Sequence, residues 1–395
     1  MQQVELEAEL LESPAASVCV SSFEGQSGTT EYHLTVRPTE YGPVEEQLER
    51  LTGAYQEALD SLGLSRETAV LRRFFCSDIQ NAVNALKSCA LSNPGASGGP
   101  CAVSWIGQAP MPPSRIALSA YHISDPDDTL QRTRIGNTTA IRRGGLTHHW
   151  STRVLSTAAD SSYGQTQGLF GEYLAYLASQ GMTLEENVLR TWFYVEDVDA
   201  NYGGLVAARR EIFAEHGLTP KTHFIASTGI EGRCADLKAR VMLDSYAISG
   251  VRPEQVEYLA ALDHLSPTHH YGVTFERATS VAYHDRKHIF ISGTASIDRH
   301  GNILYPGDVS RQLERTLENV EALLMQADAT LDDMQTFIVY VRDPSDQAFA
   351  WSRMRERFGE APIEVVVAPV CRPGWLIEVE GTAIVSACNP DLPPF

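Results

Sequence analysis

Amphipathic segments alternate with strongly apolar runs along this chain, and the alternation has a regular order. Apolar residues recur at every third or fourth position over residues 44–62, 165–180 and 309–327, which predicts three amphipathic helices. An aromatic-rich run that ends in an acidic residue follows each helix, at residues 70–78, 188–197 and 334–343, and predicts a buried strand. The same order of elements therefore occurs three times.

The remaining elements complete the three units. A second helix is predicted at 205–216 and at 346–358, whereas a Gly/Pro/Ser-rich loop over 92–100 is expected to take its place in the first unit. Residues 227–232, STGIEG, are expected to form a loop rich in backbone donors. Each unit thus predicts an α+β fold with helices on one face of a sheet. We expect three repeats, at 1–130, 131–250 and 251–395, that assemble as a pseudotrimer within one chain.

The run IEVVVAPVCRPGWLIEVEGTAIV, residues 363–385, predicts two buried strands joined tightly by a Cys-Arg-Pro-Gly turn. Glu378 and Glu380 lie within the second strand and point to the same face, because side chains alternate along a strand. Burying a carboxylate is costly unless it is paired or protonated. The two glutamates are therefore either edge-strand carboxylates that face water or groups with a chemical role.

Length, charge and cysteine usage narrow the classes of function. The 395 residues carry a net charge of −19, and no basic face is evident, which argues against a nucleic-acid partner and an anionic membrane surface. A small anionic metabolite remains possible as a partner, because a few local arginines can outweigh distant charge. The seven cysteines form no CxxC pair, which favours reduced thiols. With neither a signal peptide nor a membrane-spanning run in view, we expect a cytoplasmic monomer.

The acidic pair suggests general-acid chemistry. A glutamate with an ordinary pKa is ionised at neutral pH, but burial between Ile377 and Val379, with Glu380 nearby, would raise the pKa of Glu378. Glu378 is therefore the expected proton donor, and Glu380 is either the acid instead or an acceptor that holds a loop. An anionic substrate also needs guanidinium groups. The candidates are Arg190, Arg209, Arg210, Arg277 and Arg372.

No metal or other cofactor is expected. The paired histidines at 148–149 and 269–270 could suggest a metal site, but adjacent residues on a strand point to opposite faces. No HxH or HxxxH spacing recurs with a third ligand.

The third unit resembles the Rid superfamily (YjgF-type proteins) over residues 275–385. The matching segments are FISGTASID, GDVSRQLERTLENVEALL and LIEVEGTAIV. The resemblance implies a chorismate-mutase-like (bacillary type) α+β fold and active sites in clefts between neighbouring repeats. Deaminases of that superfamily bind the substrate carboxylate with an arginine whose place falls here at Ile363. Residues 361–369 contain no arginine, so the chain departs from that pattern.

The chorismatases, relatives within that superfamily, fit better. Cys371, Arg372, Glu378 and Glu380 match their Cys-Arg-x-x-Leu-(Leu)-x-Glu-x-Glu ending, and residues 293–297 match their Gly-Thr-Ala-Ser-Ile strand end. By this resemblance Cys371 shapes the pocket together with Ala295. Two departures are the segment DRHGNILYPGDV, which replaces a histidine-centred turn, and an extra N-terminal repeat. The resemblance extends to further residues expected at the substrate: Tyr271, Arg277, Arg190, Arg209, Thr228 and Gly229.

These observations predict a metal-free, chorismatase-like hydrolase or lyase. It would cleave chorismate or a related cyclic enol-ether carboxylate by general-acid catalysis and release pyruvate. The alternatives are an imine/enamine deaminase and a non-catalytic protein that binds a small metabolite. Aligning Tyr194 with Tyr340 puts Met242 where Glu378 stands, and the closing strand of the first unit has no acid. At most one cleft should therefore be catalytic.

Overall fold

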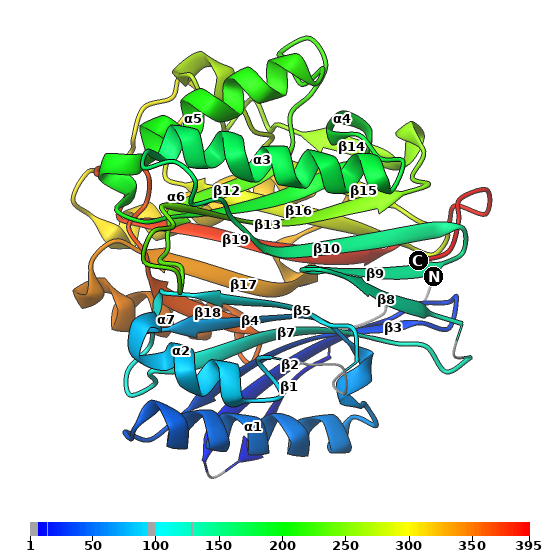
Figure 1. The fold of residues 1–395 in the computed structure, drawn as a ribbon, viewed down its shortest axis with the longest axis vertical. Coiled ribbons are helices and arrows are strands. Elements are labelled where there is room, and N and C mark those ends of the chain that lie inside the picture. Colours follow the sequence, from blue (N-terminus) through cyan, green and yellow to red (C-terminus); the bar gives the residue numbers. More distant parts are fainter. Residues whose placement is uncertain (1–6, 14, 94–98, 128) are drawn as a thin grey trace.

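Three β-sheets occupy the interior of the molecule, and the helices lie around them (Figure 1). The computed structural model describes residues 7–13, 15–93, 99–127 and 129–395, without the side chains of residues 7–13, 270 and 271. None of the described helices is long and apolar enough to cross a membrane.

The first sheet has the strand order β1-β2-β3-β7-β4-β5. Its strands are β1 (Glu7–Ser13), β2 (Ala16–Glu24), β3 (Thr30–Pro38), β4 (Ala69–Cys76), β5 (Ala102–Ile106) and β7 (Ile116–Ser124). Helices α1 (Val44–Ser61) and α2 (Ile79–Ser88) pack on it. The prediction that a loop replaces the second helix is wrong. Asp78 caps α2 by accepting a hydrogen bond from Asn81 N at 3.2 Å, so only two residues separate the end of β4 from the start of the helix.

The second sheet has the order β12-β11-β13-β10-β9-β8. Its strands are β8 (Gln131–Ile135), β9 (Thr138–Arg143), β10 (Leu146–Val154), β11 (Val188–Val195), β12 (Ala226–Glu231) and β13 (Val241–Ser249). Helices α3 (Ser162–Ser179), α4 (Leu184–Asn187) and α5 (Val198–Glu215) accompany it. The expected loop at 227–232 is instead almost wholly strand β12, because these residues pair in parallel with β11.

The third sheet has the order β14-β15-β16-β19-β17-β18-β6. Its strands are β14 (Val256–Leu259), β15 (Ala278–Ala282), β16 (Arg286–Ala295), β17 (Met334–Val341), β18 (Ile363–Val367), β19 (Ile377–Ser386) and β6 (Ala109–Pro110). Its helices are α6 (Val309–Gln326) and α7 (Gln347–Phe358). The last two strands are both buried, as predicted, but they are not joined tightly: residues 368–376 connect them, and β17 lies between β18 and β19 and hydrogen-bonds to both.

The three sheets share one topology. The orders β2-β3-β7-β4-β5, β9-β10-β13-β11-β12 and β15-β16-β19-β17-β18 are equivalent, and in each the last two strands are parallel and joined through a helix. The prediction of three tandem α+β repeats is confirmed.

Contacts between the sheets close the repeats into a ring. Gly107, at the end of β5, pairs with Arg233 of the second unit, and Ile230 of β12 pairs with Val370 of the third. Val366 of β18 in turn pairs with Pro110 of the first unit. Each unit thus pairs with the segment that precedes β13, β19 or β7 of the next unit. Three such contacts in a cycle are the arrangement of an internal pseudotrimer.

Helix α6 shows why these residues form these elements. Asp308 caps the helix by accepting a hydrogen bond from Arg311 N at 3.0 Å. Leu313, Leu317 and Leu324 lie on one face at helical spacing, and all three are buried. That apolar face packs on β16 and β19, so the opposite face of β19 is directed toward the other two units.

Candidate active site

A cavity lies between the second and third units and holds about 520 Å³ of empty space, part of it open to solvent. The second unit contributes α5 and β12, and the third contributes the ends of β16 and β19 with the loops beside them. The lining side chains that carry the argument below are Tyr202, Arg209, Ser227, Arg277, Ala295, Cys371, Arg372, Trp375 and Glu378.

Among the described residues that line this cavity, Glu378 is the only one with a carboxylate. It lies near the start of β19, directly opposite Ala295 on β16, and its side chain is 5% exposed. Gly293 on β16 permits this placement, because a Cβ added to Gly293 would overlap Glu378 Oε1. The Glu378 side chain therefore packs against the backbone of Gly293, and its carboxyl group faces the cavity.

The surroundings of Glu378 favour its neutral form. Burial is the main cause that raises its pKa, and the negative charge of Glu380 adds to the effect. Arg190 and Arg277 oppose the rise without cancelling it, and the resulting pKa is about 8. At neutral pH Glu378 can therefore donate a proton into the cavity.

Glu380 is on the same face of β19 as Glu378 but has different partners. Its Oε2 accepts a hydrogen bond from Arg190 Nη2 at 2.8 Å and another from Thr228 Oγ1, and its Oε1 accepts one from Trp192 Nε1 at 2.9 Å. The side chains of Arg190 and Glu380 are 2% and 3% exposed. Both oxygens of Glu380 are thus occupied as hydrogen-bond acceptors within the protein.

This network lies outside the cavity, although several of its members were expected at the substrate. Arg190, Thr228 and Glu380 do not line the cavity. The reason is that Arg190 and Glu380 neutralise each other behind it, and Thr228 Oγ1 also accepts a hydrogen bond from Gly293 N at 2.8 Å. Their role is to fix β12 and β16 around Glu378.

Three guanidinium groups border the cavity. Arg209 of α5 is buried and donates from Nε to Thr274 Oγ1 at 3.2 Å, across the boundary between the second and third units. Arg277 donates from Nη2 to Ser266 O at 3.0 Å. Arg372 lies over the ring of Trp375, 5.0 Å from its centre. Arg210, the neighbour of Arg209 on the helix, is exposed to solvent. The cavity is therefore positive and suits a substrate with more than one carboxylate.

Cys371 lies beside Glu378 and Tyr202. Burial, followed by the charge of Glu378, raises the pKa of its thiol to about 12. The thiol is therefore protonated at neutral pH, and the structure gives it a place in the wall of the pocket. The pKa of the Tyr202 hydroxyl is also well above its usual value, mainly because of burial.

Sequence reasoning missed several residues of the cavity. Tyr202 and Arg209 are seven residues apart on α5 and therefore share a helix face, which is a signal that could have identified Tyr202. Trp375 and Ser227 carried no such signal. Of the expected residues, Gly229 lines the cavity, whereas the side chain of Tyr271 lies outside the described residues.

The equivalent positions in the other two units lack the acid. Glu378 lies opposite Tyr340 of β17. The equivalent pairs are Met242 opposite Tyr194 in the second unit and Ala117 opposite Phe75 in the first. A proton donor of this kind is thus present in one cleft. Among the described residues no group of three or more His, Cys, Asp and Glu side chains could hold a metal ion.

The Gly293→Ala substitution is expected to reduce turnover by about a hundredfold, the cost of a displacement of roughly 1 Å in a reacting group. The added methyl group must push the Glu378 carboxyl out of its position. Steady-state rates would measure the loss. Gly171→Ala on α3, where an added methyl group meets nothing within 4 Å, should leave the rate unchanged. A Gly293→Ala protein with an undiminished rate would show that the position of Glu378 is unimportant.

The fold and the cavity together define a class of protein: a ring of three fused α+β units with an acid in one of its clefts. A family model described as Endoribonuclease L-PSP matches residues 276–385. A RutC family protein of Pyrococcus abyssi is 35% identical over 97 residues, which cover 24% of this chain and 76% of the relative. A RutC family protein of Pyrococcus horikoshii is 34% identical over 97 residues, which cover 24% of this chain and 77% of that relative.

The chain therefore belongs to the Rid superfamily, which includes the RutC-type proteins, and the sequence match lies in its third unit. Over most of its length the chain has a fold similar to that of a crystal structure of chorismatase. That similarity has a TM-score of 0.59 and covers 80% of this chain and 93% of the chorismatase, at 19% sequence identity. The predicted superfamily and its chorismatase-like fold are confirmed.

Proposed function

We propose that this protein is a chorismatase-like enzyme that cleaves chorismate, or a related cyclic enol ether with two carboxylates, and releases pyruvate. The observation that supports the proposal best is a buried glutamic acid, neutral at pH 7, in a cavity bordered by three arginines. The fold shared with chorismatase supports the same choice of reaction.

The reaction begins with a proton transfer. Glu378 gives its proton to the methylene carbon of the enolpyruvyl group, and the ether carbon becomes an oxocarbenium ion. Water adds to that carbon and returns one proton to the Glu378 carboxylate. The resulting hemiketal breaks its bond to the ring oxygen and yields pyruvate and a ring alcohol. One water is consumed, and Glu378 ends the cycle protonated.

The other cavity residues bind and shield the substrate. Arg209 and Arg277 are placed to pair with carboxylates, and their attachment to Thr274 and Ser266 limits their motion. Trp375 closes one side and is fixed by a hydrogen bond from Nε1 to Ser296 O at 3.0 Å. Cys371 and Ala295 determine the space left beside Glu378.

A coupled assay tests the proposal directly. The protein is incubated with chorismate, and pyruvate is measured with lactate dehydrogenase and NADH. We expect pyruvate to form in proportion to enzyme concentration. Absence of pyruvate, together with ammonia release from an amino-acid-derived imine, would replace the proposal by a deaminase. Tight binding of chorismate without turnover would replace it by a metabolite-binding role.

The pH dependence of turnover should report the ionisation of Glu378. The protonated form is the active form, and the folded-state pKa is about 8. The ratio kcat/KM, which reports ionisations of the free enzyme, should therefore be constant on the acid side of this value and fall tenfold per pH unit on the alkaline side. A pH–rate profile between about 6 and 10 would show this limb. A rate that rises across this range would identify a carboxylate base instead.

A further inference from the structure

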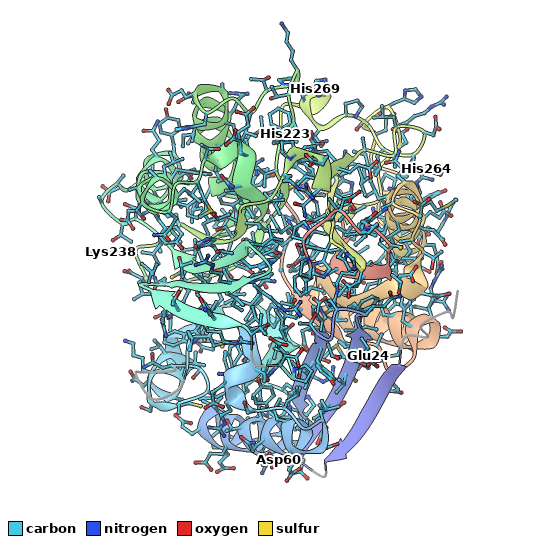
Figure 2. All side chains as sticks on the ribbon, turned by 90° about the vertical axis from the view of Figure 1, so that its right-hand side faces the viewer. Glu24, Asp60, His223, Lys238, His264 and His269 are labelled. Carbon is cyan, nitrogen blue, oxygen red and sulfur yellow. The ribbon has the colours of Figure 1, made fainter. Side chains whose placement is uncertain are left out.

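A second and larger cleft lies between the first and second units, in the position equivalent to the candidate active site. It holds about 1470 Å³ of empty space, part of it open to solvent. Its floor includes Trp105 and Tyr173, which are 5% and 2% exposed. Lys87, Glu172 and Asp236 lie at its rim and are exposed. Lys238, which follows Asp236 closely, projects from the surface (Figure 2).

The chemistry of this cleft differs from that of the active site at each equivalent position. Arg153 of β10 is equivalent to Gly293 of β16. Each residue lies where the pairing of its strand with the closing strand, β13 or β19, shifts in register. Trp105 of β5 is equivalent to Gly229 of β12, because the two residues lie opposite the equivalent residues Phe74 and Phe193. With Met242 in the place of Glu378, the cleft has lost an acid and gained a guanidinium and an indole ring.

Arg153 is held in a strained and incompletely paired state. Its backbone has φ of 53°, in the left-handed region that an arginine rarely adopts. Its backbone N–H donates to Asp244 Oδ1 at 2.9 Å, which anchors the residue at the base of the cleft. The guanidinium lies 4.3 Å from the centre of the Trp105 ring, and its buried Nε makes no hydrogen bond within the described part of the chain.

We propose that this cleft is a second ligand site and that it binds a ring-bearing amino acid. A carboxylate can pair with Arg153, whose orphaned Nε supplies a buried donor. The ring can pack on Val83, Ile135 and Leu155, apolar residues of the cleft wall that keep accessible surface. The carboxylates of Glu172 and Asp236 at the rim make the mouth of the cleft favour a ligand that carries an ammonium group over a simple acid. A proton donor equivalent to Glu378 is missing, so the site binds its ligand without converting it.

Calorimetric titration of the full chain with L-phenylalanine, L-tyrosine and L-tryptophan tests the proposal. We expect at least one of them to bind at one site per chain. The Arg153→Gly variant should weaken that binding about tenfold or more, the loss of one charge-assisted pair. Glycine tolerates the positive φ at this position, so the variant should fold normally. Arg142→Ala, which changes an exposed arginine of β9 outside the cleft, should bind like the unaltered protein.

Further titrations separate this site from the active site. The Glu378→Gln variant should bind the amino acid unchanged, so this result does not depend on the proposed reaction. 3-Phenylpropionate, which lacks the ammonium group, should bind more weakly than L-phenylalanine. The proposal is overturned by absence of binding for all three amino acids, by equal binding to Arg153→Gly, or by equal affinity for 3-phenylpropionate.

Discussion

Replacing Glu378 by glutamine is expected to lower turnover of the enol-ether substrate by about 10²- to 10⁴-fold, the usual contribution of a general acid. Glutamine has the size of the neutral glutamic acid and can occupy the space against Gly293, but it cannot donate a proton of comparable acidity. Because the pKa of Glu378 is about 8, the folded protein already holds a neutral group here at pH 7. The stability of the variant at neutral pH should therefore be close to that of the unaltered protein.

Glu364 provides a matched control for this variant. It is also a buried glutamate, 1% exposed, and burial raises its pKa to about 7. It lies on β18 and does not line the cavity. Glu364→Gln should therefore keep full turnover, measured as pyruvate formation under the same conditions. Equal loss in both variants would show that the effect of Glu378→Gln is structural, and retained activity of Glu378→Gln would remove Glu378 from the mechanism.

Removing Arg190 is expected to lower the free energy of unfolding by several kcal/mol. Arg190→Met leaves the Glu380 carboxylate buried with two neutral donors, Trp192 and Thr228. Breaking a buried ion pair on one side costs about 3–5 kcal/mol of the free energy of unfolding. Denaturant titration followed by intrinsic fluorescence would measure this loss.

Two further variants test the physical reason for that loss. The double variant Arg190→Met/Glu380→Gln removes both charges and should recover most of the stability, because the penalty comes from an uncompensated charge. Asp199→Asn weakens the pair with Arg342, whose side chains are 46% and 20% exposed, and should cost less than about 1 kcal/mol. No recovery in the double variant would show that Arg190 acts through packing and not through its charge.

Local patterns predicted most of the elements of this fold. Helix α6 has a cap at Asp308 and an apolar stripe, and the alternation along β19 predicts that Glu378 and Glu380 share a face. Helix α2 was missed because it is only ten residues long, although Asp78 offers a cap and the buried residues Ile79, Ala82 and Leu86 lie at helical spacing. Residues 227–232 read as a loop because Gly229 and Gly232 weaken a strand pattern that pairing with β11 overrides.

The partners of each charged group could not be predicted in the same way. Arg190 and Glu380 come from different units, 190 residues apart in sequence, and nothing local indicates that they neutralise each other. The same alternation that places Glu378 and Glu380 on one face does not say that one meets a cavity and the other an arginine. The location of β17 between β18 and β19 is likewise a property of the sheet, not of the segment between them.

The central claim is that the Glu378 carboxyl is neutral at physiological pH. Infrared difference spectroscopy of the unaltered protein against Glu378→Gln, recorded as a function of pH, measures this directly. We predict a protonated-carboxyl C=O band at neutral pH that disappears with a midpoint near pH 8. A band that has already disappeared near the ordinary glutamate pKa of about 4.3 would contradict the account.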